Sequence, residues 1–303
     1  MMLVVGAQEM GARFDKKHRP PDDEWFDPVY DALLGLQARA CRTALEVYHL
    51  LSDGFPKGAM ARARTLHEIA VTAMVIADYG RRSEHSDLAD RFLDHEAVAT
   101  YKEALNYQLN CETLGYEPFS DEEMADLKAR RDAVVAEYGS AYKESCGWAA
   151  GLDKPTAPTF RDLEELAKVS HLRGHYSWAS HEVHSDAKGY FLNESTWGET
   201  VYRETSYSND GLADPGHMAL ISLLQTTVSL LFSPEDTSLR SIVEAQAMSV
   251  LVERAGDAFL AAHQAVEAHN TKLQRRQARF RGLGGAARRV LRTRAAAGAK
   301  RRP

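Results

Sequence analysis

The chain has 303 residues and a net charge of −6; 44% of its residues are hydrophobic and 26% are charged. This composition is that of a soluble globular protein long enough to bury one large core or two modest ones. No apolar run approaches the roughly 18 residues of a membrane span, no secretory signal opens the chain, and three scattered cysteines exclude a disulfide framework or a zinc knuckle. We therefore expect a cytoplasmic protein without a transmembrane segment.

Helical patterns fill most of the chain after a leader, residues 1–24, whose composition indicates disorder. A first helix is expected over 27–54, because Asp27 suits the N-cap, Pro28 the first turn and Gly54 the end. Further helices are expected over 56–79, 86–113 and 120–143 and from Thr159, Asp214 and Ser233, with a long loop over 189–213. Strand patterns are nearly absent. The sequence thus predicts an all-α fold, a bundle of about seven helices in one domain over 25–270, with at least roughly 60% helix and no sheet larger than a hairpin.

The second expected helix carries a charged pair beside an apolar stretch. Arg64 and Glu68 lie one turn apart, directly before residues 69–77, which are apolar on every side and indicate a buried helix. The same face continues through Val71 and Val75, so we expect other helices to cover the pair partly. Covered charges need partners, and the pair therefore predicts polar groups on a neighbouring helix.

Four of the twelve histidines fall between His171 and His184. Histidine is the side chain most ready to transfer protons or bind a metal near neutral pH. On the helix that starts at Thr159, the apolar stripe continued at about 100° per residue arrives at His181 and His184, which predicts that both point towards the core. His171 and His175 are expected to be exposed.

The Arg64/Glu68 pair and the histidine-rich segment are expected to contact each other. Because an unpaired buried polar group costs roughly 1–3 kcal/mol, we expect a side chain of Arg64 or Glu68 to lie within about 4 Å of Ser180, His181 or His184. A structural alternative is an Arg64–Glu68 pair that locks two helices. A metal site would use His181, His184 and Glu68, with Glu182 or Glu244 as a further ligand. No Glu-x-x-His pair recurs as a di-iron bundle needs, so we assign neither metal nor cofactor.

The end of the chain has a different charge from the rest. Residues 271–303 contain twelve Lys or Arg and no acid, whereas the preceding part holds 25 basic and 43 acidic side chains, a net charge of −18. Such a segment binds nucleic-acid phosphates or anionic surfaces by charge attraction. We expect a flexible or partly helical tail that binds RNA or another nucleic acid, a membrane or partner surface, or nothing specific. The nucleic-acid-binding candidates are Arg275, Arg276, Arg279, Arg281, Arg288 and Arg289.

Three short motifs resemble those of a known family. They are Arg-Thr-Leu-His-Glu at residues 64–68, Gly147-Trp148, and Tyr176-x-x-x-Ser180-x-x-x-His184. Together they are similar to the bacterial domain-of-unknown-function family numbered 5677, over about residues 30–270. The resemblance implies an all-helical fold, and it maps the Arg-x-x-x-Glu and Ser-x-x-x-His elements of that family onto Arg64, Glu68, Ser180 and His184.

A looser likeness runs to the HEPN superfamily, helical proteins that include many RNA-cleaving toxins and defence effectors. The hallmark of that superfamily, an arginine followed after four to six residues by a histidine, implies metal-independent cleavage of RNA. Literal matches here are Arg62 with His67 and Arg42 with His49. His184 has no arginine at this distance before it.

These observations leave three functions open. The first is a HEPN-like ribonuclease in stress or phage defence, with His184 as general acid or base, His181 beside it, Arg64 stabilising the phosphorane-like charge, and Glu68 and Ser180 orienting these groups. The second is a non-catalytic helical module, monomer or homodimer, that binds a partner or nucleic acid through its basic tail. The third is a metal- or small-molecule-dependent enzyme that uses the His/Glu cluster.

Overall fold

The computed structural model describes residues 1–20, 26–153, 156–197, 200–235 and 237–299, without the side chains of 195–200 and 276–299. It is 77% helical, and the described strands form a single two-stranded antiparallel hairpin. The predicted all-α fold is therefore confirmed. Among the described helices, none is both long and apolar enough to cross a membrane.

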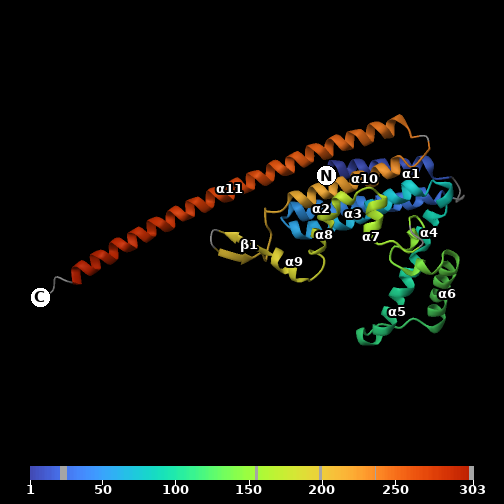
Figure 1. Cartoon of the computed structure of the whole chain (residues 1–303), viewed down its shortest axis with the longest axis horizontal. Helices are drawn as coiled ribbons and strands as arrows, with labels where there is room; N and C mark the ends of the chain where they lie inside the picture. The colour runs from blue at the N-terminus through green and yellow to red at the C-terminus, as the bar shows by residue number, and fades with distance from the viewer. Residues whose placement is uncertain (21–25, 154–155, 198–199, 236, 300–303) are drawn as a thin grey trace.

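Three helices form the centre of the bundle. Helices α2 (Pro28–Ser52), α3 (Pro56–Tyr79) and α10 (Ala213–Leu231) pack against one another (Figure 1). The predicted ends of α2 and α3 are confirmed, and the Asp27 carboxylate accepts a hydrogen bond from the Val29 amide at 2.9 Å. The stretch predicted to be buried on α3 is in the core, with Val71, Val75 and Ile76 each 0% exposed.

The leader predicted to be disordered is instead a helix over most of its length. Helix α1 (Met2–His18) packs on α2 and α10 and buries Val4, Ala7, Met10 and Phe14. These residues recur every three or four positions, which is the spacing of one helix face. One of the two helices that cover this face, α10, lies far along the chain, so the short stripe gave little sign of its burial. Residues 21–25 of the leader lie outside the described part of the chain.

The expected third helix is two helices, α4 (Leu88–Asp94) and α5 (Glu96–Leu114). Helix α5 pairs with α6 (Asp121–Tyr138), and the two project from the bundle as a hairpin (Figure 1). The predicted capping box at the start of α6 is present, with Ser120 and Glu123 bonding each other's backbone amides. Short 3₁₀ turns flank these helices at Ser83–His85, Ser140–Lys143 and Gly147–Ala149.

The expected fifth helix is interrupted. Thr159 and Asp162 cap α7 (Phe160–Leu166), but the chain then takes a left-handed conformation at Lys168, with φ of 59°. A 3₁₀ turn (Ser170–Leu172) and helix α8 (Arg173–Ser180) follow. The region expected to be a long loop contains the end of α9 (Ala187–Leu192) and the hairpin of β1 (Glu194–Trp197) and β2 (Thr200–Arg203).

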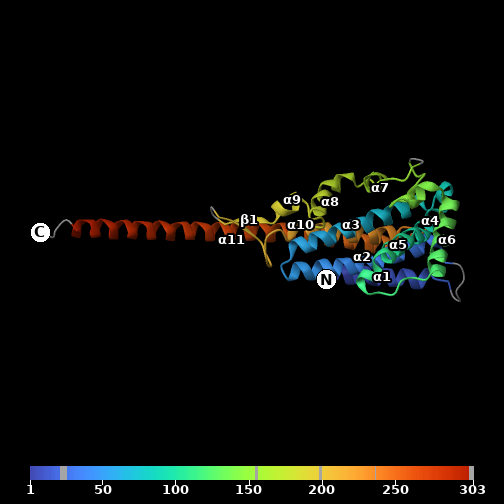
Figure 2. The same cartoon turned by 90° about the horizontal axis from the view of Figure 1, so that it is seen from below.

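The last helix is far longer than the bundle. Helix α11 (Leu239–Ala299) has 61 residues and packs on α10 with its first part. At Asn270 and Gln274 it still lines a cavity with residues of the hairpin, and beyond this point it extends away from the other helices (Figures 1 and 2). We call residues 271–303 the basic arm. The part of the arm that is described, up to Ala299, is helical.

Candidate functional site

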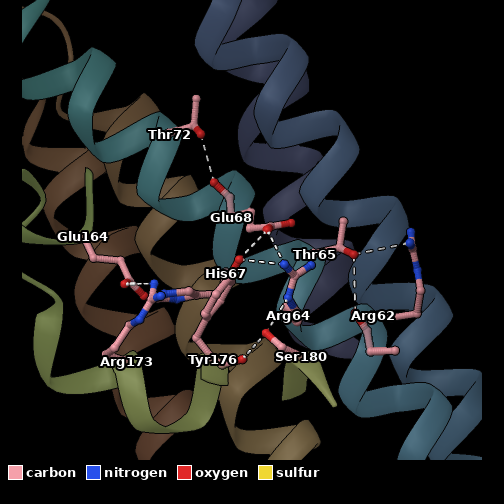
Figure 3. A network of polar contacts seen from close by, with 11 residues as sticks. Arg62, Arg64, Thr65, His67, Glu68, Thr72, Glu164, Arg173, Tyr176 and Ser180 are labelled. Atoms are coloured by element: carbon pink, nitrogen blue, oxygen red, sulfur yellow. Dashed lines mark hydrogen bonds and ion pairs between the residues drawn. The ribbon is translucent and has the colours of Figure 1, made fainter. Parts of the chain in front are cut away.

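A polar network joins α3 to α8 (Figure 3). The Arg64 guanidinium donates from Nε to Ser180 Oγ at 3.0 Å and from Nη2 to the Tyr176 hydroxyl at 2.7 Å. The same Nη2 lies 3.1 Å from Glu68 Oε1, in an ion pair within α3. The predicted contact between the Arg64/Glu68 pair and Ser180 is thereby confirmed. The predicted partial cover of the pair is also present, because the Arg64 and Glu68 side chains are 17% and 35% exposed.

Tyr176 is the centre of this network. Its hydroxyl accepts from Arg64 and donates to Glu68 Oε1 at 2.9 Å, while its ring lies 4.6 Å from the Arg64 guanidinium carbon. Burial, reinforced by the hydrogen bond to Glu68, raises the pKa of the Tyr176 phenol to about 12. The phenol therefore stays protonated at neutral pH and acts as a hydrogen-bond bridge between an arginine and a carboxylate.

The Ser180 hydroxyl already donates one hydrogen bond and accepts another. Its oxygen accepts from Arg64, and its proton goes to the Tyr176 backbone carbonyl at 2.9 Å. A serine nucleophile needs a neighbouring base that accepts the hydroxyl proton, and a carbonyl oxygen is not such a base. The geometry around Ser180 therefore connects α8 to α3 and does not activate the hydroxyl.

A second, deeper group extends the network to α7. His67 Nε2 lies 3.0 Å from Glu164 Oε1, and Arg173 donates to Glu164 Oε2 at 2.7 Å. His67 and Glu164 are both 0% exposed. Burial lowers the pKa of His67, although Glu164 acts in the opposite direction. Because Nδ1 of His67 is buried without a hydrogen-bond partner, we assign the proton of the neutral ring to Nε2, facing the carboxylate.

The two histidines predicted to point inward do not join this network. Helix α8 ends at Ser180, His184 is exposed, and the half-buried His181 pairs through Nδ1 with Asp186 Oδ2 at 2.7 Å. Extending one helical phase from α7 to His184 was wrong because the chain breaks at Lys168 and the helix stops before either histidine. His171 and His175 are exposed, as predicted.

The residues of the metal alternative are divided among other contacts. Glu68 belongs to the Arg64 network, and Glu244 on α11 accepts from both Arg13 and Arg240. Within the described residues, no group of three His, Cys, Asp or Glu side chains is arranged to hold a metal ion. The predicted metal-ligand set is therefore not brought together.

The arginine and histidine of the best HEPN-like match face different surroundings. Arg62 pairs with Glu46 of α2 at 2.5 Å, whereas His67 is buried against Glu164 of α7. In the second match, Arg42 and His49 are both exposed on α2. The first pair therefore does not form the joint arginine–histidine site that this likeness implies.

Sequence reasoning missed the deeper half of the network. His67, Glu164 and Arg173 come from three helices, and their pairing depends on how α7 and α8 lie on α3. For Tyr176 one signal was available, because it precedes Ser180 by one turn and so shares the face that meets α3.

Among the predicted nucleic-acid-binding residues of the arm, Arg275 is exposed. The side chains of Arg276, Arg279, Arg281, Arg288 and Arg289 lie outside the described residues.

Comparison with known proteins agrees with the motif resemblance. A family of unknown function, DUF5677, matches residues 30–198, which include most of α2, all of α3, α7 and α8, and the whole polar network. The match ends well before residue 270, so α10 and α11 lie outside it. No curated protein and no solved structure matches the chain. Because the family match spans more than half of the sequence, the chain belongs to the DUF5677 family.

Proposed function

We propose that this chain is a helical module that binds nucleic acid through its basic arm. The observation that carries the proposal is the location of the charge: twelve Lys or Arg and no acid on a segment whose described part is a helix extending away from the bundle. From Gln274 to Ala299 this helix spans about 37 Å at 1.5 Å per residue. A helix of this length offers basic side chains to several successive phosphates.

The rest of the molecule supports this division of roles. With a net charge of −18, residues 1–270 repel a polyanion as a whole, so the arm is the part that approaches it. Binding of this kind releases counterions from the nucleic acid and does not depend on base sequence. It therefore requires no base-reading groups on the bundle.

Ribonuclease chemistry at the α3–α8 network is not part of this proposal. General acid–base catalysis needs a titratable group within hydrogen-bond reach of the reacting atoms. Arg64 is occupied by Glu68, Tyr176 and Ser180, and the exposed His184 lies outside the network. The network is instead suited to holding α8 in place on α3.

The test compares two pairs of charges on the full-length chain. Arg288→Gln/Arg289→Gln removes charge from the arm, and Lys128→Gln/Arg130→Gln removes the same charge from the exposed face of α6. Glutamine keeps the helix propensity of the residues it replaces. Fluorescence anisotropy with a short labelled single-stranded RNA, repeated over a range of salt concentrations, gives the affinity and its salt dependence.

We expect the arm pair to weaken binding and to reduce the slope of log K against log salt by about 1.4 if both arginines contact phosphates. The α6 pair should leave affinity and slope unchanged or raise the affinity slightly. Equal effects of the two pairs, or no effect of the arm pair, would overturn the proposal. Duplex DNA should respond in the same way, because the contacts are to phosphates.

A further inference from the structure

The last turn of α1 and the start of α11 line a basic cavity. The start of α11 is the end of this helix that lies on the bundle, opposite the arm (Figure 1). Its volume is about 510 Å³, within the usual range for a small-molecule site of roughly 300–1,000 Å³. The apolar side of the lining comes from Met10 and Phe14 of α1 and Leu231 of α10, which are all buried. The cavity exists only because residues 2–18 fold onto the bundle.

The charged part of the lining is almost entirely basic. Four Lys or Arg side chains line the cavity together with His18, against one acid, Glu244; the four are Arg13, Lys16, Lys17 and Arg240. In a region of the chain with a net charge of −18, this concentration of positive charge stands out from its surroundings.

Internal pairing accounts for part of this charge only. Glu244 Oε1 accepts from Arg13 Nη2 at 2.5 Å and from Arg240 Nε at 2.8 Å, and Arg13 Nη1 also lies 3.8 Å from Glu9 Oε2, so both arginines have acidic partners. Lys16 and Lys17 are exposed and form no ion pair with any described residue. Two ammonium groups at the cavity therefore remain available to an anion.

The start of α11 adds polar groups on the opposite wall. Ser238 Oγ accepts from the Ser241 amide at 3.1 Å and lies 2.9 Å from Ser241 Oγ, and both serines line the cavity. The positive end of the helix dipole and hydroxyl donors both favour a bound oxyanion. This wall supplements the lysines, which carry the main attraction.

We propose that this cavity binds a small organic phosphate whose remainder is apolar or aromatic, in the manner of a mononucleotide. Lys16, Lys17 and the start of α11 would bind the phosphate group. Met10, Phe14 and Leu231 would contact the planar or apolar part of the ligand. Inorganic phosphate alone would make no contact with that lining. The proposal goes beyond the function of the arm and does not rest on it, because the two sites lie at opposite ends of α11.

The experiment titrates the full-length protein with adenosine monophosphate, adenosine and inorganic phosphate by calorimetry. The nucleotide should bind, while adenosine and inorganic phosphate should each bind at least about tenfold more weakly, a difference of about 1.4 kcal/mol. Nucleotide binding no tighter than that of inorganic phosphate would contradict the role of the apolar lining. Equal binding of adenosine would contradict the role of the lysines.

Two variants separate the cavity from the arm. Lys16→Gln/Lys17→Gln should weaken nucleotide binding about tenfold or more, because charged hydrogen-bonding partners of the phosphate are lost. Arg288→Gln/Arg289→Gln should leave nucleotide binding unchanged while weakening RNA binding. If the arm pair removes nucleotide binding and the lysine pair does not, the nucleotide binds at the arm and the cavity proposal fails, whatever the outcome for RNA.

Discussion

The α3–α8 network and the α1–α11 cavity are both rich in charge, but they differ in how that charge is satisfied. In the network, each charged side chain faces a partner of opposite charge: Arg64 faces Glu68, and Arg173 faces Glu164. At the cavity, Arg13 and Arg240 share Glu244 and Arg13 also pairs with Glu9, but two lysines have no acidic partner among the described residues. Charges that are paired internally hold helices together, whereas charges left unpaired are available to a ligand. The difference predicts where a substitution should affect stability and where it should affect binding.

The largest loss of stability is expected from Glu164→Ala. Glu164 is 0% exposed, and its removal leaves Arg173 without its carboxylate and His67 without its hydrogen bond. Removing one partner of a buried ion pair lowers the free energy of unfolding by about 3–5 kcal/mol. Because Arg173 is partly exposed and can bind water, we expect a loss at the lower end of this range. The free energy of unfolding from urea titration measures it. The neighbouring exposed Glu165→Ala is the control and should change stability by less than about 0.5 kcal/mol.

A smaller loss is expected from Tyr176→Phe. The variant keeps the ring under Arg64 but removes the hydroxyl that bridges Arg64 and Glu68. The free energy of unfolding should fall by about 1 kcal/mol, because Glu68 is exposed enough to bind water instead. Tyr116→Phe, at an exposed tyrosine beyond the end of α5, should have no measurable effect. Equal losses in the two variants would mean that the bridge contributes nothing.

The buried histidine makes the network sensitive to acid. The pKa of His67 in the folded state lies below its ordinary value of 6.5, mainly because of burial. As the pH falls, the His67 ring therefore takes up a proton in the unfolded chain before it does so in the folded protein. The contribution of the neutral ring to the free energy of unfolding is fully present above about pH 6.5 and is lost progressively below it. His67→Gln should reduce the difference in unfolding free energy between pH 7.5 and pH 5.5, whereas the exposed His175→Gln should retain it. An unchanged difference in His67→Gln would place the acid sensitivity elsewhere.

The sequence predicted what local rules determine and missed what distant contacts decide. The limits of α2 and α3 follow from Asp27-Pro28 and the segments beside them, and the contact of Arg64 with Ser180 follows from the need of a half-covered ion pair for polar partners. His184 was misplaced because nothing local reveals the left-handed turn at Lys168. Helix α1 was missed because its short apolar stripe gains stability only against α2 and α10. The cavity could not be predicted without α1.

The smallest effect on stability is expected from Lys16→Gln/Lys17→Gln. Both lysines lie in the last turn of α1, where a positive charge favours the helix dipole. They also lie at one cavity with Arg13 and Arg240, and the removal of two like charges relieves repulsion there. Because these effects oppose each other, the free energy of unfolding should change by less than about 0.5 kcal/mol.

This pair gives the sharpest test of the comparison when it is set beside Tyr176→Phe. The two variants should differ in the property that they lose. The lysine pair should lose nucleotide affinity, and the Tyr176→Phe variant should lose stability. Addition of adenosine monophosphate should raise the melting temperature of the Tyr176→Phe protein but not that of the lysine pair, because a ligand stabilises only the folded state that binds it. If the lysine pair instead loses as much stability as Tyr176→Phe, Lys16 and Lys17 serve the fold, and their charge is not reserved for a ligand.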